Sequence, residues 1–227
     1  MLVFALLAGC SWNSNNNENK EDGFSEEIET SEQKLYKRAQ GSLRSSNFRS
    51  AIEQLEQLES RFPFGRYAEQ AQLELIYAKY MTSRLDEANA SADRFIRLHP
   101  QHPNIDYAYF MKGMTGYYAD EGLLGNLFSL SLAKRDIGGA MQSYADLTEF
   151  LIRYPESEYI DAARERLIFL RNLIASSELD GAEYYMKRGA YLAALNRANY
   201  VLKNIPNSTE TQRALDIMKK SFIELGY

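Results

Sequence analysis

The chain has 227 residues, of which 45% are hydrophobic and 25% are charged, and its formal net charge is −5. With 26 basic and 31 acidic side chains, it lacks the excess of positive charge that marks a nucleic-acid-binding protein. One cysteine excludes an intrachain disulfide, and no apolar run approaches the roughly 20 residues of a membrane-spanning helix.

The first ten residues, MLVFALLAGC, place small residues directly before Cys10. This ending resembles the lipobox of bacterial lipoproteins, in which the leader is cut before a cysteine that then receives lipid. The resemblance implies a signal peptide over residues 1–9 and a lipid anchor on Cys10. No basic residue precedes Leu2, so we expect that the true start lies upstream or that the leader was trimmed. The alternative is a buried N-terminal cysteine.

Residues 10–30 are predicted to form a flexible tether that carries the lipid. Residues 11–30 are polar and rich in asparagine, a composition typical of disorder. They hold six acidic residues and one basic residue, so the rest of the chain is electrically balanced. Thr30 and Gln33 have the spacing of a capping box, which predicts that the first helix begins at Thr30.

Residues 31–227 show an internal repeat. In three segments an amphipathic helix is followed by a proline, and the apolar residues keep one internal spacing. The matching positions are Phe48, Ala51, Leu55, Leu58 and Pro63; Leu85, Ala88, Ala92, Phe95 and Pro100; and Tyr191, Ala194, Ala198, Val201 and Pro206. A small residue that opens the second helix and a proline about twelve residues later are typical of the tetratricopeptide repeat.

The fold class predicted from this register is all-α, a tetratricopeptide-repeat superhelical solenoid of about five helix pairs. A bundle of ordinary helices is the alternative. The third unit runs from Ile105 to Pro155, with an insertion over residues 119–135 that either contacts a partner or folds back. Separate helices are expected over residues 159–176 and 178–189. The last helix is expected over residues 207–226, with a cap pattern from Asn207 and Glu210.

The sequence offers no constellation for catalysis or for a cofactor. His99 and His102 lie together in a loop, but a two-histidine metal site needs a third ligand, and none is suitably placed. No glycine-rich phosphate loop follows a strand. We therefore expect a protein that is not an enzyme and holds no metal.

A binding groove is predicted on the first helix of each pair, which lines the concave face in such arrays. Tyrosine suits recognition because it has an apolar ring and a polar tip, although any one of these rings can instead serve only to pack helices together. The predicted groove residues are Gln33, Tyr36, Gln40, Arg44, Tyr77, Tyr80, Tyr107, Phe110, Met114 and Tyr117.

Several longer stretches resemble the BamD family of outer-membrane assembly lipoproteins. They run in order along the chain and are longer than the generic repeat consensus. The stretches are RFPFG over residues 61–65, residues 67–78, residues 92–100, HPNIDY over residues 102–107, residues 166–170, residues 182–185 and residues 188–190.

The resemblance implies a scaffold that helps to fold and insert β-barrel proteins into the outer membrane. Such proteins are lipid-anchored, face the periplasm, and join the barrel-forming subunit BamA and smaller lipoproteins. The N-terminal repeats would bind the C-terminal β-signal of unfolded outer-membrane proteins, and the C-terminal repeats would hold BamA. We expect the BamA contact near Tyr191 and Arg197, unless this is only a solvated helix face. Ser11 after Cys10 is consistent with sorting to the outer membrane.

Two other interpretations of the function are open. A different tetratricopeptide lipoprotein, acting in pilus assembly or cell-wall coordination, would share the fold and anchor but not the BamA contact. An exported enzyme built on a helical array would need a polar pocket, for which the sequence shows no residues.

Overall fold

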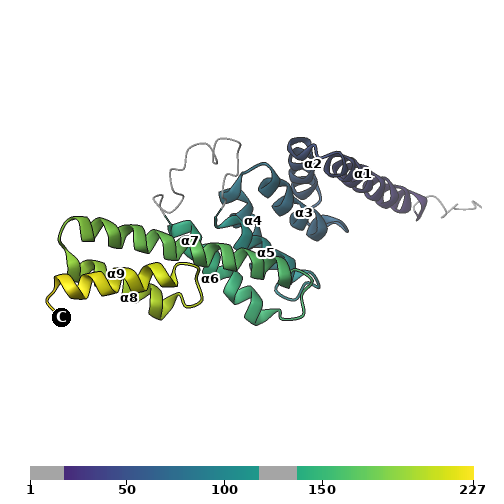
Figure 1. Ribbon diagram of the computed structural model, residues 1–227. Coiled ribbons are helices and arrows are strands. Elements are labelled where there is room, and N and C mark those ends of the chain that lie inside the picture. Colours follow the sequence, from purple (N-terminus) through teal and green to yellow (C-terminus); the bar gives the residue numbers. More distant parts are fainter. Residues whose placement is uncertain (1–17, 118–136) are drawn as a thin grey trace, which may run out of the picture. The chain divides into compact units, whose positions relative to one another are not determined.

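The computed structural model describes residues 18–117 and 137–227, and all regular secondary structure in them is helical (Figure 1). The helices are α1 (Glu18–Arg44), α2 (Phe48–Arg61), α3 (Ala68–Met81), α4 (Leu85–Leu98), α5 (Ile105–Thr115), α6 (Gly138–Arg153), α7 (Ile160–Lys187), α8 (Tyr191–Asn204) and α9 (Thr211–Glu224). The chain divides into two compact parts, an N-terminal part of residues 1–71 and a C-terminal part of residues 72–227.

Several pairs of successive helices form hairpins joined by short turns, as the repeat register predicts, whereas residues 116–137 separate α5 from α6. In three of these turns the middle residue is left-handed, with φ of 57° at Ser46, 58° at Ser83 and 72° at Gly189. The amide of the next residue then bonds back to a carbonyl five residues earlier, as in Arg84 N–H to Lys79 O at 3.0 Å. This hydrogen bond satisfies a carbonyl at the end of the first helix and reverses the chain.

The second helices of the hairpins end in one recurring way. Phe62, His99, Tyr154 and Ile205 each cap a helix, with φ between −131° and −128° and ψ between 52° and 62°. A proline follows each of them. Because proline restricts the preceding residue to extended conformations, it ends the helix at a fixed point. The prediction that Pro63, Pro100, Pro155 and Pro206 close the units is confirmed.

The small residues of the register lie where paired helices meet. Ala51, Ala88 and Ala194 are all fully buried. In the third unit the same position, twelve residues before Pro155, is occupied by Ser143, which sequence reasoning did not single out. Ser143 is buried as well, and its hydroxyl donates a 2.6 Å hydrogen bond to the carbonyl of Gly113 on α5. A serine is tolerated there because its polar group has a partner.

Three predicted helix boundaries are wrong. Helix α1 begins at Glu18, so residues 18–30, expected to belong to the tether, are helical. They contain no proline, several of them are good helix formers, and their acidic residues favour a helix N-terminus. Helix α9 begins at Thr211, because Asn207 takes a left-handed conformation (φ 62°) in the preceding turn instead of capping the helix.

The third correction concerns α7, which is one continuous helix of 28 residues where two were expected. No proline interrupts it, and Ser176 and Ser177 are too weak as helix breakers to end it. At 1.5 Å per residue it is about 42 Å long. Its length allows α7 to pack against α5 and α6 as well as against α8 and α9.

The core of the C-terminal part is one continuous cluster of buried side chains from α3 to α9. Its largest fully buried side chains are Phe95, Phe150, Ile76, Leu147, Leu170, Leu179 and Val201. In the N-terminal part α1 packs on α2, and Leu35 and Ala39 of α1 and Ile52 and Leu55 of α2 are buried. None of the described helices combines the length and apolar character needed to cross a membrane.

We predict opposite effects for two glycine-to-alanine substitutions. A Cβ at Gly113 would lie 2.5 Å from a methyl carbon of Leu147, so Gly113→Ala should lower the free energy of unfolding by about 1–3 kcal/mol. Gly41 has open space around its Cβ position, so Gly41→Ala should raise it by about 0.5–1 kcal/mol. Urea denaturation of both variants measures this, and equal effects would contradict the packing described.

Candidate functional site: an aromatic face and a charged helix trio

An aromatic cluster joins α5 to the start of α7. Tyr159, the residue before α7, lies with its ring centroid 5.4 Å from Tyr107 and stacks on Phe110 at 5.0 Å. Phe110 also meets Phe150 of α6 at 5.8 Å. Aromatic contacts at these distances stabilise beyond the area they bury. The cluster therefore fixes the face of α5 on which Tyr107 lies.

Helix α3 contributes to the same cluster. Burial raises the pKa of Tyr107 well above its usual range, and the nearby groups Tyr159, Tyr77 and Glu74 act in the same direction. These groups affect Tyr107 because they lie close to its phenol oxygen. Tyr77 is 38% exposed, so it presents part of its ring to solvent. Helices α3 and α5, the first helices of the second and third repeats, thus share one aromatic face.

Tyr159 is held at the edge of this face by the loop before α7. Burial raises the pKa of its phenol to about 12, and a hydrogen bond to Glu158 adds to the shift. In the same loop, Ser157 donates a 2.6 Å hydrogen bond to Asp106 at the start of α5. Sequence reasoning placed Tyr159 only as a helix start. Its position just after the proline turn of the third unit was the available signal.

The predicted groove residues are distributed between surface and interior. Tyr77, Tyr107 and Phe110 lie together in the aromatic cluster described above. Phe110 is only 8% exposed, so it supports the face from inside. Met114 and Tyr117 continue along α5 and are half-buried, as is Tyr80 on α3. The backbone carbonyl of Tyr117 accepts a hydrogen bond from the Arg166 guanidinium of α7.

The four predicted groove residues of α1 belong to the first unit. Gln33, Tyr36 and Gln40 are half-buried, and Arg44 is exposed. Tyr36 stacks on Tyr67, with ring centroids 4.5 Å apart. This stack fixes the ring against the loop before α3.

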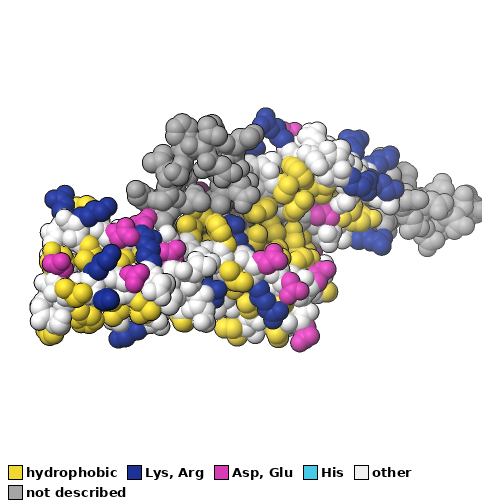
Figure 2. Space-filling model, in the orientation of Figure 1, with side chains coloured by type: hydrophobic (Ala, Val, Ile, Leu, Met, Phe, Trp, Pro, Cys, Tyr) yellow, Lys and Arg dark blue, Asp and Glu magenta, His cyan; other side chains and the backbone are white. Residues whose placement is uncertain are grey.

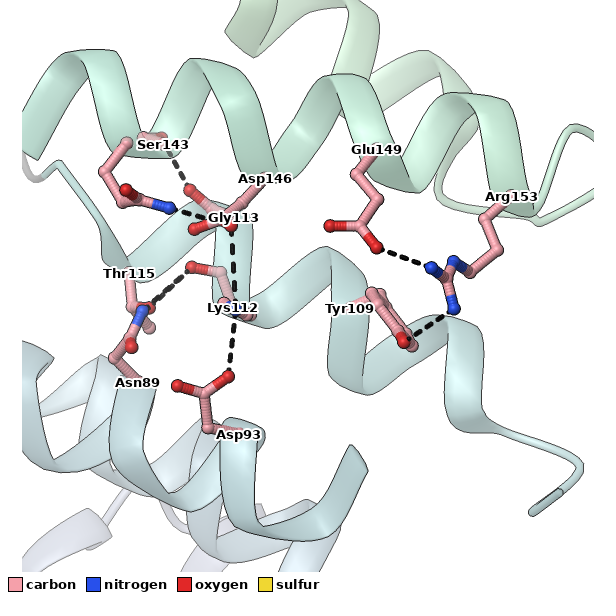
Figure 3. Close-up of polar contacts among 11 residues, drawn as sticks. Asn89, Asp93, Tyr109, Lys112, Gly113, Thr115, Ser143, Asp146, Glu149 and Arg153 are labelled. Carbon is pink, nitrogen blue, oxygen red and sulfur yellow. Dashed lines mark hydrogen bonds and ion pairs between the residues drawn. The ribbon is translucent and has the colours of Figure 1, made fainter. Parts of the chain in front are cut away.

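A polar network holds α5 between α4 and α6 (Figure 3). Lys112 of α5 pairs with Asp93 of α4 at 2.9 Å and with Asp146 of α6 at 3.6 Å. Asn89 of α4 donates hydrogen bonds to Thr115 Oγ1 at 2.9 Å and to the Lys112 carbonyl at 3.3 Å. Burial alone would lower the pKa of Lys112, but the hydrogen bond to Asp93 and the nearby carboxylate of Asp146 outweigh it and raise this pKa.

About one turn before Lys112, at Tyr109 in the middle of α5, Arg153 of α6 joins the two helices (Figure 3). Its guanidinium donates to the hydroxyl of Tyr109 at 3.0 Å, lies 5.0 Å from the centroid of the same ring, and pairs with Glu149 at 2.7 Å. Planar guanidinium groups are suited to such combined stacking and pairing. Helix α5 is thereby held at two points along its length, which fixes the orientation of its aromatic face.

The predicted partner surface lies on α8, in the trio formed by α7, α8 and α9. Arg197 pairs with Glu178 of α7 at 2.8 Å and lies 5.4 Å from the ring centroid of Tyr185. A Cβ at Gly181 would come within 3.1 Å of this guanidinium, so the glycine makes room for it. The Arg197 side chain remains 41% exposed. Tyr191 lies at the start of α8 and is half-buried.

Arg213 of α9 pairs with three carboxylates, two of which lie on α7. It contacts Asp180 at 2.7 Å, Glu183 at 2.9 Å and Glu210 at 3.1 Å. Hydrogen bonds to these groups raise the pKa of Arg213 although burial opposes the shift. The loop before α9 is also held, because Thr209 N–H donates to Asn172 of α7 at 3.0 Å. Helix α7 is thus joined by side-chain contacts both to α9 and, through Glu178, to Arg197 of α8.

The histidine loop serves packing. His99 lies 3.1 Å from Gln72 through its Nε2, and both His99 and His102 contact the ring of Phe95. Within residues 18–117 and 137–227, no group of three His, Cys, Asp or Glu side chains is placed to hold a metal ion. Cys10, the signal peptide and the insertion over residues 119–135 lie outside the described residues.

Comparison with known proteins identifies the family of this chain. Residues 28–227 match the family model YfiO, described as outer membrane lipoprotein. Curated relatives carry the name outer membrane protein assembly factor BamD. The relative from Neisseria meningitidis serogroup A is 40% identical, covering 86% of this chain and 73% of its own length. The relative from Vibrio cholerae is 35% identical, covering 100% of this chain and 90% of its own length.

The chain therefore belongs to the YfiO family of outer membrane lipoproteins, the family of BamD. A third relative, from Xylella fastidiosa, is 34% identical over 100% of this chain and 75% of its own length. The resemblance inferred from the sequence is confirmed. The prediction that the chain is not an enzyme is confirmed too, since the family consists of assembly factors. A solved tetratricopeptide repeat protein from Parabacteroides merdae is 14% identical, with a TM-score of 0.41 over 87% of this chain and 74% of its own.

The shifted tyrosine predicts a pH dependence of stability. The folded-state pKa of Tyr159, about 12, lies above its ordinary value of 10.0, so folding favours the protonated phenol. This contribution to stability is complete below pH 10 and is lost as the pH rises toward 12. Tyr159→Phe should therefore flatten the fall in unfolding free energy over this range. Urea denaturation at several pH values tests this, and Tyr227→Phe, at a residue 90% exposed, should leave the slope unchanged.

Proposed function

We propose that this chain is a lipid-anchored scaffold of the outer-membrane β-barrel assembly machinery. In this proposal lipid on Cys10 holds the chain to the outer membrane on its periplasmic side. The N-terminal repeats bind unfolded outer-membrane proteins, and the C-terminal repeats bind a BamA-type barrel subunit beside other lipoproteins of the complex. This proposal is supported by the relatives of the chain, which are named outer membrane protein assembly factors.

The observation that carries the substrate part is the aromatic face of α3 and α5. Strands of β-barrel membrane proteins alternate apolar and polar residues, with aromatic residues at both membrane interfaces. An extended chain of this kind matches a surface that offers partly exposed rings, such as Tyr77, over a fixed aromatic interior. Lys112 and Arg153 hold α5 in place, so the face is formed before a substrate arrives. Preorganisation of this kind reduces the entropic cost of binding.

The observation that supports the partner part is the geometry of Arg197. Its ion pair with Glu178 and its contact with Tyr185 hold the guanidinium on the surface of α8 while part of it stays exposed. Arginine held in this way is a frequent hot spot of protein interfaces. A carboxylate on the partner would find the guanidinium already oriented.

A peptide-binding measurement tests the substrate part. We expect a peptide copied from the last strand of an outer-membrane barrel to bind the full chain, and Tyr77→Ala to weaken binding about fivefold to thirtyfold, the effect of losing an aromatic anchor. Tyr200→Ala is the matched control, because Tyr200 on α8 is 39% exposed against 38% for Tyr77. Fluorescence anisotropy gives both affinities. Equal losses in the two variants would exclude the aromatic face as the site.

A charge exchange separates recognition from stability at Arg197. Arg197→Glu should lower recovery of a BamA-type subunit from detergent-solubilised envelope at least tenfold. The double variant Glu178→Arg with Arg197→Glu restores an intramolecular ion pair but places a carboxylate on the outer surface. We expect it to recover the thermal stability of the wild type and not its partner binding. If partner binding returns with stability, Arg197 has only a structural role.

A further inference from the structure

The outward face of α1 in the first unit is strongly basic. Lys34, Lys37, Arg38 and Arg44 are all exposed. The only acidic residue among residues 31–44 is Glu32, which is buried and accepts a 2.8 Å hydrogen bond from the Tyr67 amide. Glu32 is therefore committed to the loop before α3. The exposed part of this stretch carries positive charge without any exposed carboxylate to balance it.

These cations gather on one side of the helix. At 3.6 residues per turn, the four side chains fall within an arc of about 120°, opposite the buried residues Leu35 and Ala39. Several Lys and Arg side chains lie at the surface of the coloured part of α1 in the space-filling view (Figure 2). Gly41 lies in the middle of the arc, and nothing approaches within 4 Å of its Cβ position. This basic face is thus open at its centre.

Grouping like charges on a helix face opposes folding slightly, because side chains three or four residues apart repel one another. It also creates a positive potential that attracts an anionic partner and speeds its association. The basic face lacks an apolar side chain that could enter a bilayer, as helices that lie in a membrane interface require. Residues 18–30, which precede it in α1, are predominantly acidic in sequence and would be repelled by anionic lipid.

We propose that the basic face of α1, formed by Lys34, Lys37, Arg38 and Arg44, binds an acidic polypeptide segment of another envelope protein. Charge complementarity selects this partner. Carboxylates spaced along a helix or an extended segment would pair with the cations on either side of Gly41. This proposal rests on the side chains of the first unit alone and stands whether or not the aromatic face binds substrate.

A photo-crosslinker at Gly41 tests the proposal in the full chain. The photoreactive residue p-benzoylphenylalanine replaces Gly41 in a second gene copy in the bacterium that makes the protein. After irradiation, the crosslinked species is digested and its attached peptide sequenced. We expect an adduct to a peptide of net negative charge. The triple variant Lys34→Glu, Lys37→Glu, Arg38→Glu should reduce this adduct at least tenfold.

The matched control is Lys203→Glu, Lys219→Glu, Lys220→Glu, which changes the net charge equally at exposed positions of α8 and α9. It should leave the adduct within about twofold of the wild type, since exposed charges act mainly within a Debye length. Circular dichroism melting of both triple variants confirms folding. An adduct to lipid, an adduct to a neutral or basic peptide, an equal loss in the control, or no adduct at all would overturn the proposal.

Discussion

The close approach of paired helices is the constraint on which the rest of this structure depends. It requires a small residue twelve positions before each proline that ends a helix pair, and Ala51, Ala88, Ser143 and Ala194 meet this requirement with no exposed surface. On the facing helix of the third unit, Gly113 is equally necessary, because a Cβ there would collide with Leu147. Interiors are packed as densely as crystals, so one extra methyl group at such a position displaces a helix.

Charged side chains add specificity to this packing. Lys112 joins α4, α5 and α6, and Arg213 joins α9 to α7 through Asp180 and Glu183. Partly buried ion pairs contribute little net stability, because desolvation offsets their attraction, but a mispaired charge is costly. These networks therefore disfavour other registers of the same amphipathic helices. They also hold the faces of α5 and α8 that the proposed functions use.

The aromatic residues for which we propose a role in recognition also pack the helices together. Tyr107 and Phe110 were predicted as groove residues, yet Phe110 lies in the interior and Tyr107 packs on Tyr159. A repeat array buries only part of each first helix, so its aromatic residues lie partly in the core and partly at the surface. Tyr77, at the edge of the cluster, combines both properties.

The sequence by itself determined the fold class, the proline-terminated register and the family, because these depend on local spacing and on long matching stretches. It also located the small positions of three units. Only the tertiary structure decided that α7 is continuous, because two weakly separated amphipathic segments become one helix when neighbours pack along both. Asn207 likewise lost its predicted capping role to a left-handed turn. The pairing of Arg197 with Glu178 and of Tyr107 with Tyr159 joins residues far apart in the chain, whose contact no local pattern encodes.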